Sequence, residues 1–296
     1  MFDILTPTYN RAHTLGRVLQ SLLDQTEKRF TWLIIDDAST DDTEALIEMW
    51  KDKYPDLHIE YIKLDKNGGK SRAVNIGLEV CKNPYVIIAD SDDGFDASTL
   101  SDLRDLWHSI DEQSHADNVA AIWSLVKRSD GNLIGERFPE DRWLATFEDR
   151  ILNYDIQGEK WHCWRTAVLR KYGMYVHQQC HVEESATWNR INRDYLFLCV
   201  NLAHRTYYES QDGMILRKKS TSELAAINYV STYYDLANAS IKEIIRHKFF
   251  RLRAFDHIKS RLHFNDKKLV LSPSKRIISF LIFLFVLPKR LIKKLL

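Results

Sequence analysis

Residues 85–93 read Tyr85-Val86-Ile87-Ile88-Ala89-Asp90-Ser91-Asp92-Asp93, and this stretch decides the fold. Its apolar part, residues 85–89, has the length and the β-branched character of a strand buried on both faces. The strand ends in three carboxylates within four residues, which repel one another unless a cation or several hydrogen-bond donors lie among them. The pattern indicates either a divalent-metal site or the acidic start of a following helix, which Asp93, Asp96 or Ser98 could begin.

The overall composition is that of a globular protein with a hydrophobic core. The chain has 296 residues, enough for one large domain or two smaller ones, and 45% of them are hydrophobic. The net charge of +1 argues against a general nucleic-acid binder, although the basic excess lies at the C-terminus. The four cysteines have neither CxxC pairs nor zinc-type spacing, so we expect reduced thiols. The first residues lack a signal-peptide pattern, and we therefore expect the globular part to stay in the cytoplasm.

Strands and helices alternate at the start of the chain. Strands are expected at residues 2–5, 31–35, 59–62 and 85–89, each followed by a polar loop, and apolar residues at helical spacing follow the first three loops. This alternation predicts an α/β fold with a mostly parallel sheet flanked by helices on both faces. Ligands of such sheets bind beyond the carboxyl ends of the strands, which is where all the polar loops should lie.

Four polar loops should therefore face one crevice. They are residues 6–11, 36–37, 67–72 and 90–93. A single polar loop is unremarkable, because turns are normally polar and glycines often serve only the backbone conformation. Four of them, each mixing hydrogen-bond donors, acids or an aromatic ring, favour a binding site.

The glycine loop at residues 67–70, Asn-Gly-Gly-Lys, invites comparison with phosphate-binding loops. It matches neither GxxxxGK[ST] nor GxGxxG, which disfavours a Walker NTPase and a dinucleotide site. Lys70 and Arg72 could meet a base or a phosphate at the start of a helix, or they could be ordinary solvated charges.

In their order and spacing, these segments resemble family 2 glycosyltransferases of the GT-A fold. The residues that carry the resemblance are 6–11, 35–39, 67–77 and 89–93, which cover roughly the first third of the chain. The resemblance implies a Rossmann-like GT-A domain that binds a nucleotide-sugar donor, with UDP as the implied nucleotide. It also implies that Mn²⁺ or Mg²⁺ holds the diphosphate at the Asp-x-Asp element.

The resemblance also implies roles for individual residues. The residues implied for the nucleotide sugar are Thr6, Pro7, Thr8, Tyr9, Arg11, Asp37, Asn67, Lys70, Arg72, Asp90 and Ser91. Asp37 would hydrogen-bond to the base edge, Arg72 would lie near the base, and Asp90 would contact the ribose or the metal shell. Asp92 is the first choice for the metal ligand and Asp93 the alternative. Such a metal takes a few carboxylates plus phosphate oxygens and neutralises charge as the nucleoside diphosphate leaves.

The middle of the chain, residues 119–207, loses the clean alternation and becomes rich in aromatic residues. Its tryptophans are Trp123, Trp143, Trp161, Trp164 and Trp188. Most should lie in the core, and one or two could form a sugar-stacking platform for the acceptor. His162, His177 and His181 lack the spacing of metal ligands, so we expect no metal cluster among them.

A second candidate for chemistry lies at residues 181–190. Family 2 members usually have a Glu-Asp pair at the start of a helix, followed by an aromatic residue and an arginine, and the second acid is the catalytic base. Glu183 and Glu184, followed by Trp188 and Arg190, resemble this pattern, with a glutamate in place of the aspartate. The resemblance implies that Glu184 takes the proton of the acceptor hydroxyl in an inverting transfer, with Glu183 as a helper or structural acid. The alternative is an ordinary acidic helix start favoured by the macrodipole.

The last thirty residues, 267–296, are basic and contain no acid. Their cations are Lys267, Lys268, Lys275, Arg276, Lys289, Arg290, Lys293 and Lys294. The apolar run between them, residues 277–287, is too short to cross a bilayer, which takes about 20 residues. We expect a helix lying in the membrane interface, with its cations on anionic headgroups and Phe280, Phe283 and Phe285 in the acyl boundary. A buried terminal helix or an oligomer contact is the alternative.

Together these patterns predict three parts: a nucleotide-sugar-binding half at 1–118, an acceptor-binding half at 119–212, and a helical, membrane-associating region at 213–296. The expected function is inverting, metal-dependent transfer of a hexosyl or N-acetylhexosaminyl group to a lipid-linked glycan in cell-surface polysaccharide synthesis. We expect the protein to be peripheral on the cytoplasmic side of the cell membrane. The alternatives are a non-catalytic membrane-bound scaffold of the same fold and a nucleotidyltransferase, whose glycine- and arginine-rich loop after the first strand is missing here.

Overall fold

The computed structural model describes residues 1–154, 156–209 and 218–295, with side chains up to residue 285. The elements are β1 (Phe2–Thr8), α1 (Gly16–Leu23), β2 (Phe30–Asp36), α2 (Thr43–Lys53), β3 (Ile59–Lys63), α3 (Lys70–Val80), β4 (Tyr85–Ile88), β5 (Gly94–Phe95), α4 (Thr99–Asp111), η1 (Ala116–Asn118), β6 (Val119–Arg128), β7 (Trp143–Ala145), η2 (Glu148–Asn153), β8 (Lys160–Arg165), α5 (Thr166–Tyr172), α6 (Glu184–Asp194), β9 (Leu196–Tyr207), α7 (Thr221–Asn238), α8 (Ile241–Arg246), α9 (Lys248–Ser260) and α10 (Pro273–Leu295). The expected boundary at residue 213 and the side chains of Lys289, Arg290, Lys293 and Lys294 lie outside the described part.

One nine-stranded sheet organises the molecule, with the order β3-β2-β1-β4-β8-β6-β9-β5 and with β7 paired to β9. The predicted α/β class and the parallel first part are confirmed, because β1 pairs in parallel with β2 and β4, and β2 with β3. Beyond β4 the sheet is mixed: β8 runs antiparallel to both β4 and β6, whereas β9 runs parallel to β6. The same sheet therefore crosses the expected boundary at residue 118.

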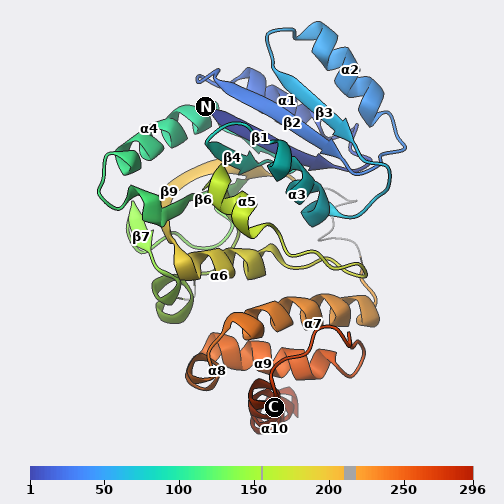
Figure 1. The fold of residues 1–296 in the computed structure, drawn as a ribbon, viewed down its shortest axis with the longest axis vertical. Helices are drawn as coiled ribbons and strands as arrows, with labels where there is room; N and C mark the ends of the chain where they lie inside the picture. The colour runs from blue at the N-terminus through green and yellow to red at the C-terminus, as the bar shows by residue number, and fades with distance from the viewer. Residues whose placement is uncertain (155, 210–217, 296) are drawn as a thin grey trace.

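Both faces of the parallel strands are buried, as the apolar runs predict. Alternate residues point to opposite cores: Ile4 and Ile87 belong to one buried cluster, and Leu5 and Val86 belong to the other. Helices α1, α2 and α4 contribute to the first cluster, and α3, α5 and α6 to the second. Figure 1 shows these helices on the two faces of the sheet. Because helices cover both faces of the sheet, polar side chains can gather at the carboxyl ends of β1, β2 and β4.

The acidic residues after β4 do not begin a helix. The short strand β5 separates Asp92 and Asp93 from α4, which begins at Thr99 after Ser98. Of the three residues that could begin a helix, Ser98 does so, whereas Asp93 and Asp96 do not. The three carboxylates therefore need another explanation.

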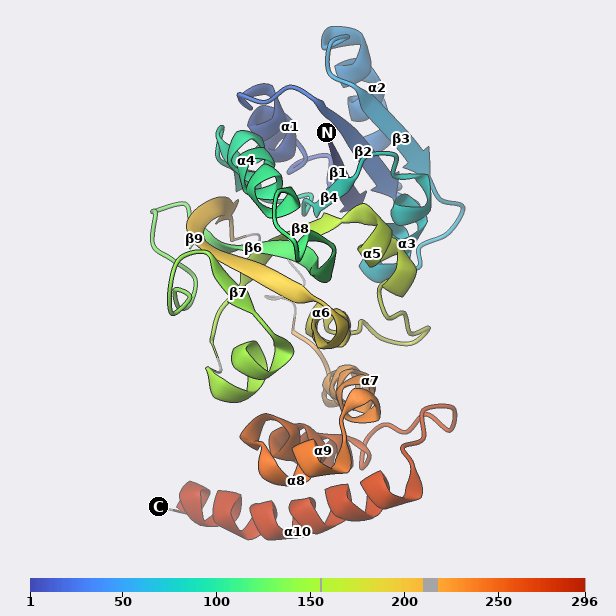
Figure 2. The same cartoon turned by 60° about the vertical axis from the view of Figure 1, so that its left-hand side comes forward.

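The C-terminal helices form a separate layer beneath α6 (Figures 1 and 2). Helix α7 packs on α6, α9 packs on α7, and α10 packs on α8 and α9. Figure 2 shows α10 along the outer side of this layer, at the far end of the molecule from β1–β3. Helix α9 therefore lies between α10 and the rest of the protein.

Helix α10 has one packed face and one bare face. Ser279 is fully buried, and Phe283 stacks on Phe255 of α9 with ring centroids 5.2 Å apart. The expectation that Phe283 faces lipid is therefore wrong, because its ring closes the contact between α9 and α10. Among the side chains of α10 up to residue 285, the large apolar ones that remain exposed are Ile277, Phe280, Leu281, Leu284 and Phe285. Their spacing places them on one side of the helix. Within the described residues, no helix is long and apolar enough to span a membrane.

Candidate functional site

A large cavity opens where β1, β2 and β4 end, and its volume is about 1340 Å³. The residues singled out from the sequence that line it are Pro7, Thr8, Tyr9, Arg11, Asp37, Asn67, Lys70, Asp90, Ser91, Asp92, Glu183 and Glu184. The opposite wall comes from η2, β8, β9 and α9 together with α6. The polar loops and the acidic helix start thus face one space, although up to about 175 residues separate them along the chain.

Two residues implied for the nucleotide sugar do not line the cavity. Thr6 is fully buried inside β1, and its Oγ1 accepts a hydrogen bond from Trp32 Nε1 at 3.0 Å. Arg72 donates from Nη1 to the carbonyl of Lys66 at 3.0 Å and lies 3.7 Å from Asp37. Thr6 therefore belongs to the core, which corrects its expected contact with the donor. Arg72 braces the glycine loop beside Asp37, and its expected place near the base stays a prediction.

The glycine loop is held by Asp37. The Asp37 carboxylate accepts hydrogen bonds from the backbone N–H of Gly68 at 2.9 Å and of Gly69 at 2.6 Å. Gly69 has φ +86°, a backbone conformation that L side chains rarely adopt, so this position requires glycine. Because these two N–H groups already bind Asp37, they are not free to cradle a phosphate, in agreement with the missing phosphate-loop motifs.

Two side chains at the end of β1 line the cavity. Tyr9 is 45% exposed, so its ring can stack against a planar group. Thr8 is buried, and its Oγ1 has no hydrogen-bond partner among the residues that the structure describes. Buried hydroxyls are almost always paired, which makes this oxygen a candidate contact for a ligand.

Lys70 joins the loop after β4 to the acidic helix start. Its Nζ lies 2.5 Å from Asp90 Oδ1 and 2.8 Å from Glu184 Oε1. Burial disfavours the charge on Lys70, but the two carboxylates outweigh it and raise the pKa of Lys70 above its ordinary value. Lys70 is therefore a fixed cation between the two groups of acids.

Arg205 of β9 is the second cation among these acids. It donates from Nε to Asp93 Oδ2 at 2.6 Å and from Nη2 to Asp90 Oδ2 at 2.9 Å. Burial alone would raise the pKa of Asp90, but the charges of Lys70 and Arg205 lower it to about 2. Asp93 also accepts from the backbone N–H of Tyr208 at 3.2 Å and does not line the cavity. Asp93 thus lies behind the cavity as an anchor for Arg205, which removes it as the alternative metal ligand.

Asp92 is the acid of this group that is open to a cation. It lines the cavity, and its carboxylate has no hydrogen bond or ion pair with any residue that the structure describes. Burial, followed by the negative charge of Asp90, raises the pKa of Asp92 above its ordinary value. Within the described residues, no cluster of three or more His, Cys, Asp or Glu side chains could hold a metal alone. One open carboxylate fits a divalent ion that takes its other oxygens from phosphate and water.

The two glutamates at the start of α6 point to different partners. Glu183 donates its backbone N–H to Ser231 Oγ at 2.9 Å, and its carboxylate lies 3.2 Å from Arg253 Nη1 of α9. Glu184 instead meets Lys70 on the side of Asp90 and Asp92. Glu183 therefore ties α6 to the C-terminal helices, whereas Glu184 belongs to the group of charges in the cavity.

Most of the aromatic residues are core, and Arg190 is structural. Trp123 and Trp188 line the cavity, but each is only 5% exposed, and Trp188 stacks on Trp164 with centroids 4.5 Å apart. Arg190 donates to the carbonyls of Tyr172 and Gly173 at 2.5 and 2.8 Å. The tryptophans therefore support the wall of the cavity rather than offer a wide stacking platform.

Several side chains of the cavity were not singled out from the sequence. They are Arg150, Lys160, Arg205 and Tyr207, together with Lys248, Phe249, Leu252, Arg253 and Asp256 of α9. His162, whose spacing in the sequence is not that of a metal ligand, also lines the cavity. The residues of α9 show that the region expected to associate with a membrane, 213–296, also contributes to the cavity wall. These are single residues on strands and helices without a local motif, and only the packing of distant elements brings them together.

The sequence was compared with known families and proteins. The family model described as "Glycosyl transferase family 2" matches residues 3–171, more than half of the chain. The poly(ribitol-phosphate) beta-N-acetylglucosaminyltransferase TarS of Staphylococcus aureus is 29% identical over 186 residues, which cover 60% of this chain and 30% of TarS. The abequosyltransferase RfbV of Salmonella typhimurium is 25% identical over 208 residues, covering 69% of this chain and 59% of RfbV. The chain thus spans about a third of the length of TarS and somewhat over half that of RfbV.

Solved structures share the fold at low sequence identity. A crystal structure of S. aureus TarS in complex with UDP-GlcNAc aligns with a TM-score of 0.65 and 18% identity, covering 95% of this chain and 79% of that chain. The mannosyltransferase PcManGT of Pyrobaculum calidifontis, in complex with GDP-Man and Mn²⁺, aligns with a TM-score of 0.60 and 18% identity, covering 94% and 78%. These alignments confirm the predicted GT-A fold.

Proposed function

The chain belongs to glycosyl transferase family 2, and from this premise we propose that it is an inverting, metal-dependent glycosyltransferase. The donor is a nucleotide sugar, with UDP as the nucleotide, and the acceptor is a lipid-linked glycan of cell-surface polysaccharide synthesis. The observation that carries the proposal is the bridge formed by Lys70, which lies 2.5 Å from Asp90 and 2.8 Å from Glu184. The candidate base and the candidate phosphate site thus lie on either side of the same lysine. Transfer between two bound substrates requires them to be this close.

The donor is assigned to the side of the cavity built by residues 1–118. Tyr9 is exposed and can stack on the base, and Thr8 and Asp37 are buried beside it in the cavity lining. The family relative TarS was solved with UDP-GlcNAc, and another solved neighbour contains GDP-Man. The TarS complex supports UDP as the first nucleotide to test.

The metal is assigned to Asp92, with Asp90 close by. The bound ion would offset negative charge on the departing nucleoside diphosphate. Asp90 is held between Lys70 and Arg205, so it keeps its charge and its orientation whether or not an ion is present. The oxygen ligands offered here fit Mn²⁺ or Mg²⁺, because these ions take carboxylate and phosphate oxygens.

Glu184 is assigned as the base. In an inverting transfer the acceptor oxygen forms a bond to the anomeric carbon while the bond to the diphosphate breaks and its electron pair leaves with the nucleotide. The acceptor hydroxyl proton passes to the Glu184 carboxylate, which Lys70 holds at the cavity. Glu183 is assigned a structural role, since its carboxylate faces Arg253.

Association with an anionic membrane is assigned to the bare face of α10. Its apolar side chains, such as Phe280 and Phe285, are exposed, and Lys275 and Arg276 lie on the turn before them. This combination suits a helix in the membrane interface. Curated relatives are named for abequosyl transfer and for teichuronic acid biosynthesis, which supports a surface glycan as the acceptor. The protein would then work as a peripheral enzyme on the cytoplasmic face.

A nucleotide-release assay tests the proposal. The purified chain is incubated with a panel of UDP-, GDP- and CDP-sugars, each with Mn²⁺ and with chelator, and the free nucleotide is measured. We expect slow release from one nucleotide class only, dependent on the metal, with water as the acceptor. Absence of release from every donor, both alone and with anionic vesicles that carry a lipid-linked glycan extract, would contradict the proposal and favour a non-catalytic scaffold.

A further inference from the structure

Five cations of the cavity wall differ in whether they pair with acids. Lys70, Arg205 and Arg253 each form ion pairs with carboxylates. Arg150 and Lys160 also line the cavity, but neither forms an ion pair with any residue that the structure describes. Two positive charges without a directly paired carboxylate therefore face the cavity, and acids such as Glu159 for Lys160 and Asp235 for Arg150 act on them only at longer range.

Arg150 is held rigidly by neutral groups. It donates from Nε to Asn192 Oδ1 at 2.9 Å and from Nη2 to Asn189 Oδ1 at 2.7 Å. Its guanidinium lies over the ring of Trp123, 4.6 Å from the centroid, and the residue is only 9% exposed. The third nitrogen, Nη1, has no hydrogen-bond partner among the residues that the structure describes. A planar donor group is thus fixed in place with one nitrogen free on the cavity side.

A buried cation without a counterion is costly, by several kcal/mol in typical proteins. Burial lowers the pKa of Arg150 to about 10, which still leaves the side chain charged at neutral pH. Amide oxygens and an aromatic face offset only part of this cost. The site is therefore more favourable when an anion enters it.

Lys160 adds a second charge on the same side. Its Nζ donates to the carbonyls of Gln157 at 3.0 Å and Gly158 at 3.4 Å and lies over the ring of Phe138. Burial lowers the pKa of His162, and the nearby charges of Arg150, Arg205 and Lys160 lower it further. The neutral His162 ring thus lies among these cations and does not compete for an anion.

We propose that Arg150 and Lys160 form an anion subsite that binds a phosphate or carboxylate group of the acceptor. The assignment to the acceptor rests on the proposed function, in which Glu184 receives the acceptor proton. Glu184 and Asn189, the anchor of Arg150, both lie on α6, and five residues of helix correspond to about 7.5 Å. The donor phosphates are assigned to Asp92, on the loop after β4. The acceptor class is therefore an anionic glycan whose charged group lies roughly one sugar unit from the attacking hydroxyl.

A chain of contacts fixes this subsite relative to the base. Asn189 Nδ2 donates to Asp235 Oδ1 at 3.1 Å, and Asp235 Oδ2 lies 3.0 Å from Arg253 Nε. Arg253 in turn pairs with Glu183, the residue before Glu184. The anion subsite and the start of α6 are thus held by one buried network, which pre-organises the distance between the acceptor's charge and its reacting hydroxyl.

Calorimetric titration of the full chain with inorganic phosphate tests the subsite. The titration is run on the wild type and on Arg150→Gln, each with and without saturating UDP and Mn²⁺. We expect Arg150→Gln to weaken phosphate binding roughly 10- to 100-fold, because hydrogen bonds to charged groups contribute about 1.5–3 kcal/mol. Arg150→Lys, which keeps the charge, should restore much of the affinity, and Lys160→Gln should weaken it less. Thermal unfolding of each variant checks that it is folded.

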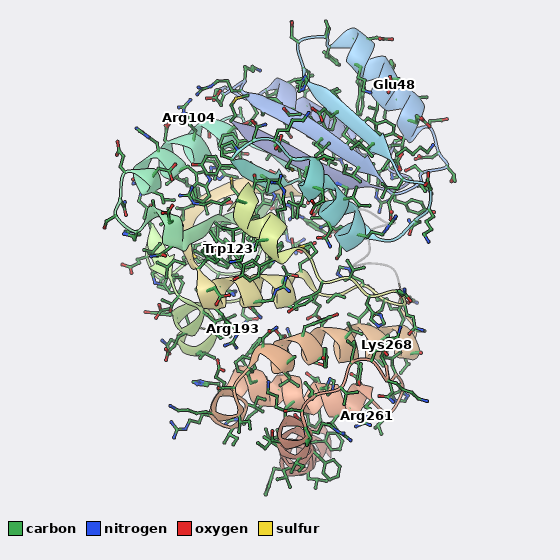
Figure 3. All side chains as sticks on the ribbon, in the orientation of Figure 1. Glu48, Arg104, Trp123, Arg193, Arg261 and Lys268 are labelled. Carbon is green, nitrogen blue, oxygen red and sulfur yellow. The ribbon has the colours of Figure 1, made fainter. Side chains whose placement is uncertain are left out.

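Arg193 supplies the matched control. Its guanidinium also lies over an aromatic ring, 4.1 Å from the centroid of Phe147, but it is paired with Glu243 at 3.0 Å. Figure 3 labels Trp123 on the sheet side of α6 and Arg193 on the side of the C-terminal helices. Arg193→Gln should leave phosphate affinity unchanged.

The outcomes separate the subsite from the proposed function. Phosphate affinity that survives Arg150→Gln would overturn the subsite. Loss of phosphate binding on addition of UDP and Mn²⁺ would overturn the acceptor assignment, because the anion would then occupy the donor's place. Phosphate binding that depends on Arg150 in a chain that binds no nucleotide would support the subsite and count against the proposed function. Repeating the titration with glucuronate distinguishes a carboxylate from a phosphate ligand.

Discussion

Replacement of Glu184 by glutamine removes the proposed base with little change in shape. The amide keeps the length of the side chain and an oxygen that can accept a hydrogen bond from Lys70, which now lies 2.8 Å from Oε1. It loses the negative charge and the ability to take a proton. Lys70 keeps its contact with Asp90 at 2.5 Å, so the donor side of the cavity should stay in place.

The expected loss follows from the role of a general base. Positioned proton transfer typically contributes 10²–10⁴-fold, which corresponds to about 2.7–5.5 kcal/mol in the activation free energy. Donor affinity should change little, because the wild-type carboxylate contacts Lys70 rather than the loops of Tyr9 and Asp37. The variant should thus lose kcat at nearly unchanged donor Kd.

The assay pairs metal-dependent nucleotide binding, measured by calorimetry, with nucleotide release from the donor, measured as turnover. Glu183→Gln is the matched control, because the same substitution one residue earlier removes a carboxylate that faces Arg253 at 3.2 Å. We expect Glu183→Gln to keep most of the turnover and to lower the free energy of unfolding instead.

Two results would refute this reasoning. Near-normal turnover in Glu184→Gln would place the base elsewhere. Equal losses of turnover in the two variants, with equal losses of stability, would mean that the acidic pair only supports the start of α6.

Three further predictions concern the metal, the membrane and acid stability. Asp92→Asn should abolish the metal dependence of nucleotide binding, since an amide is a poorer ligand, and calorimetry that still shows a metal effect would contradict the assignment. Phe280→Asp with Phe285→Asp should release the protein from anionic vesicles in a sedimentation assay, and unchanged sedimentation would remove α10 as the anchor. Burial lowers the pKa of His257 to about 4 from 6.5, so its contribution to folding is complete above pH 6.5 and falls by roughly 1.4 kcal/mol per pH unit down to about pH 4. In urea unfolding, the free energy of unfolding of His257→Gln should therefore fall less than that of the wild type as the pH drops over that range. An equal fall in both proteins would contradict the lowered pKa of His257.

The first half of the fold is predictable because its information is local. Each of β1, β2 and β4 is an apolar run followed by polar residues, and sequential βα units can pair only in a few ways. The places of β6, β8 and β9 in the sheet could not be predicted in this way, because β8 pairs with β4 and β6 and the sheet order departs from the chain order. Tertiary pairing, rather than local sequence, decides their place.

The residues of the site likewise fall into those that the sequence could predict and those that it could not. Loop residues such as Asp37, Lys70 and Asp92 could be singled out because they follow predicted strands. The position of a residue in a motif does not give the direction of its side chain. The sequence therefore could not show that Thr6 and Asp93 are buried away from the cavity. Arg205 and Arg150 could not be found in this way, since Arg205 meets Asp93 across 112 residues and Arg150 meets Asn189 across 39.

The central claim is that the cavity binds a nucleotide through a divalent metal at Asp92. Calorimetric titration of the purified chain with UDP, GDP and CDP, each with Mn²⁺ and with chelator, tests it most directly. The account predicts binding of one nucleotide, UDP, that is lost with chelator. Binding of no nucleotide under either condition, or UDP binding that is indifferent to the metal, would contradict it.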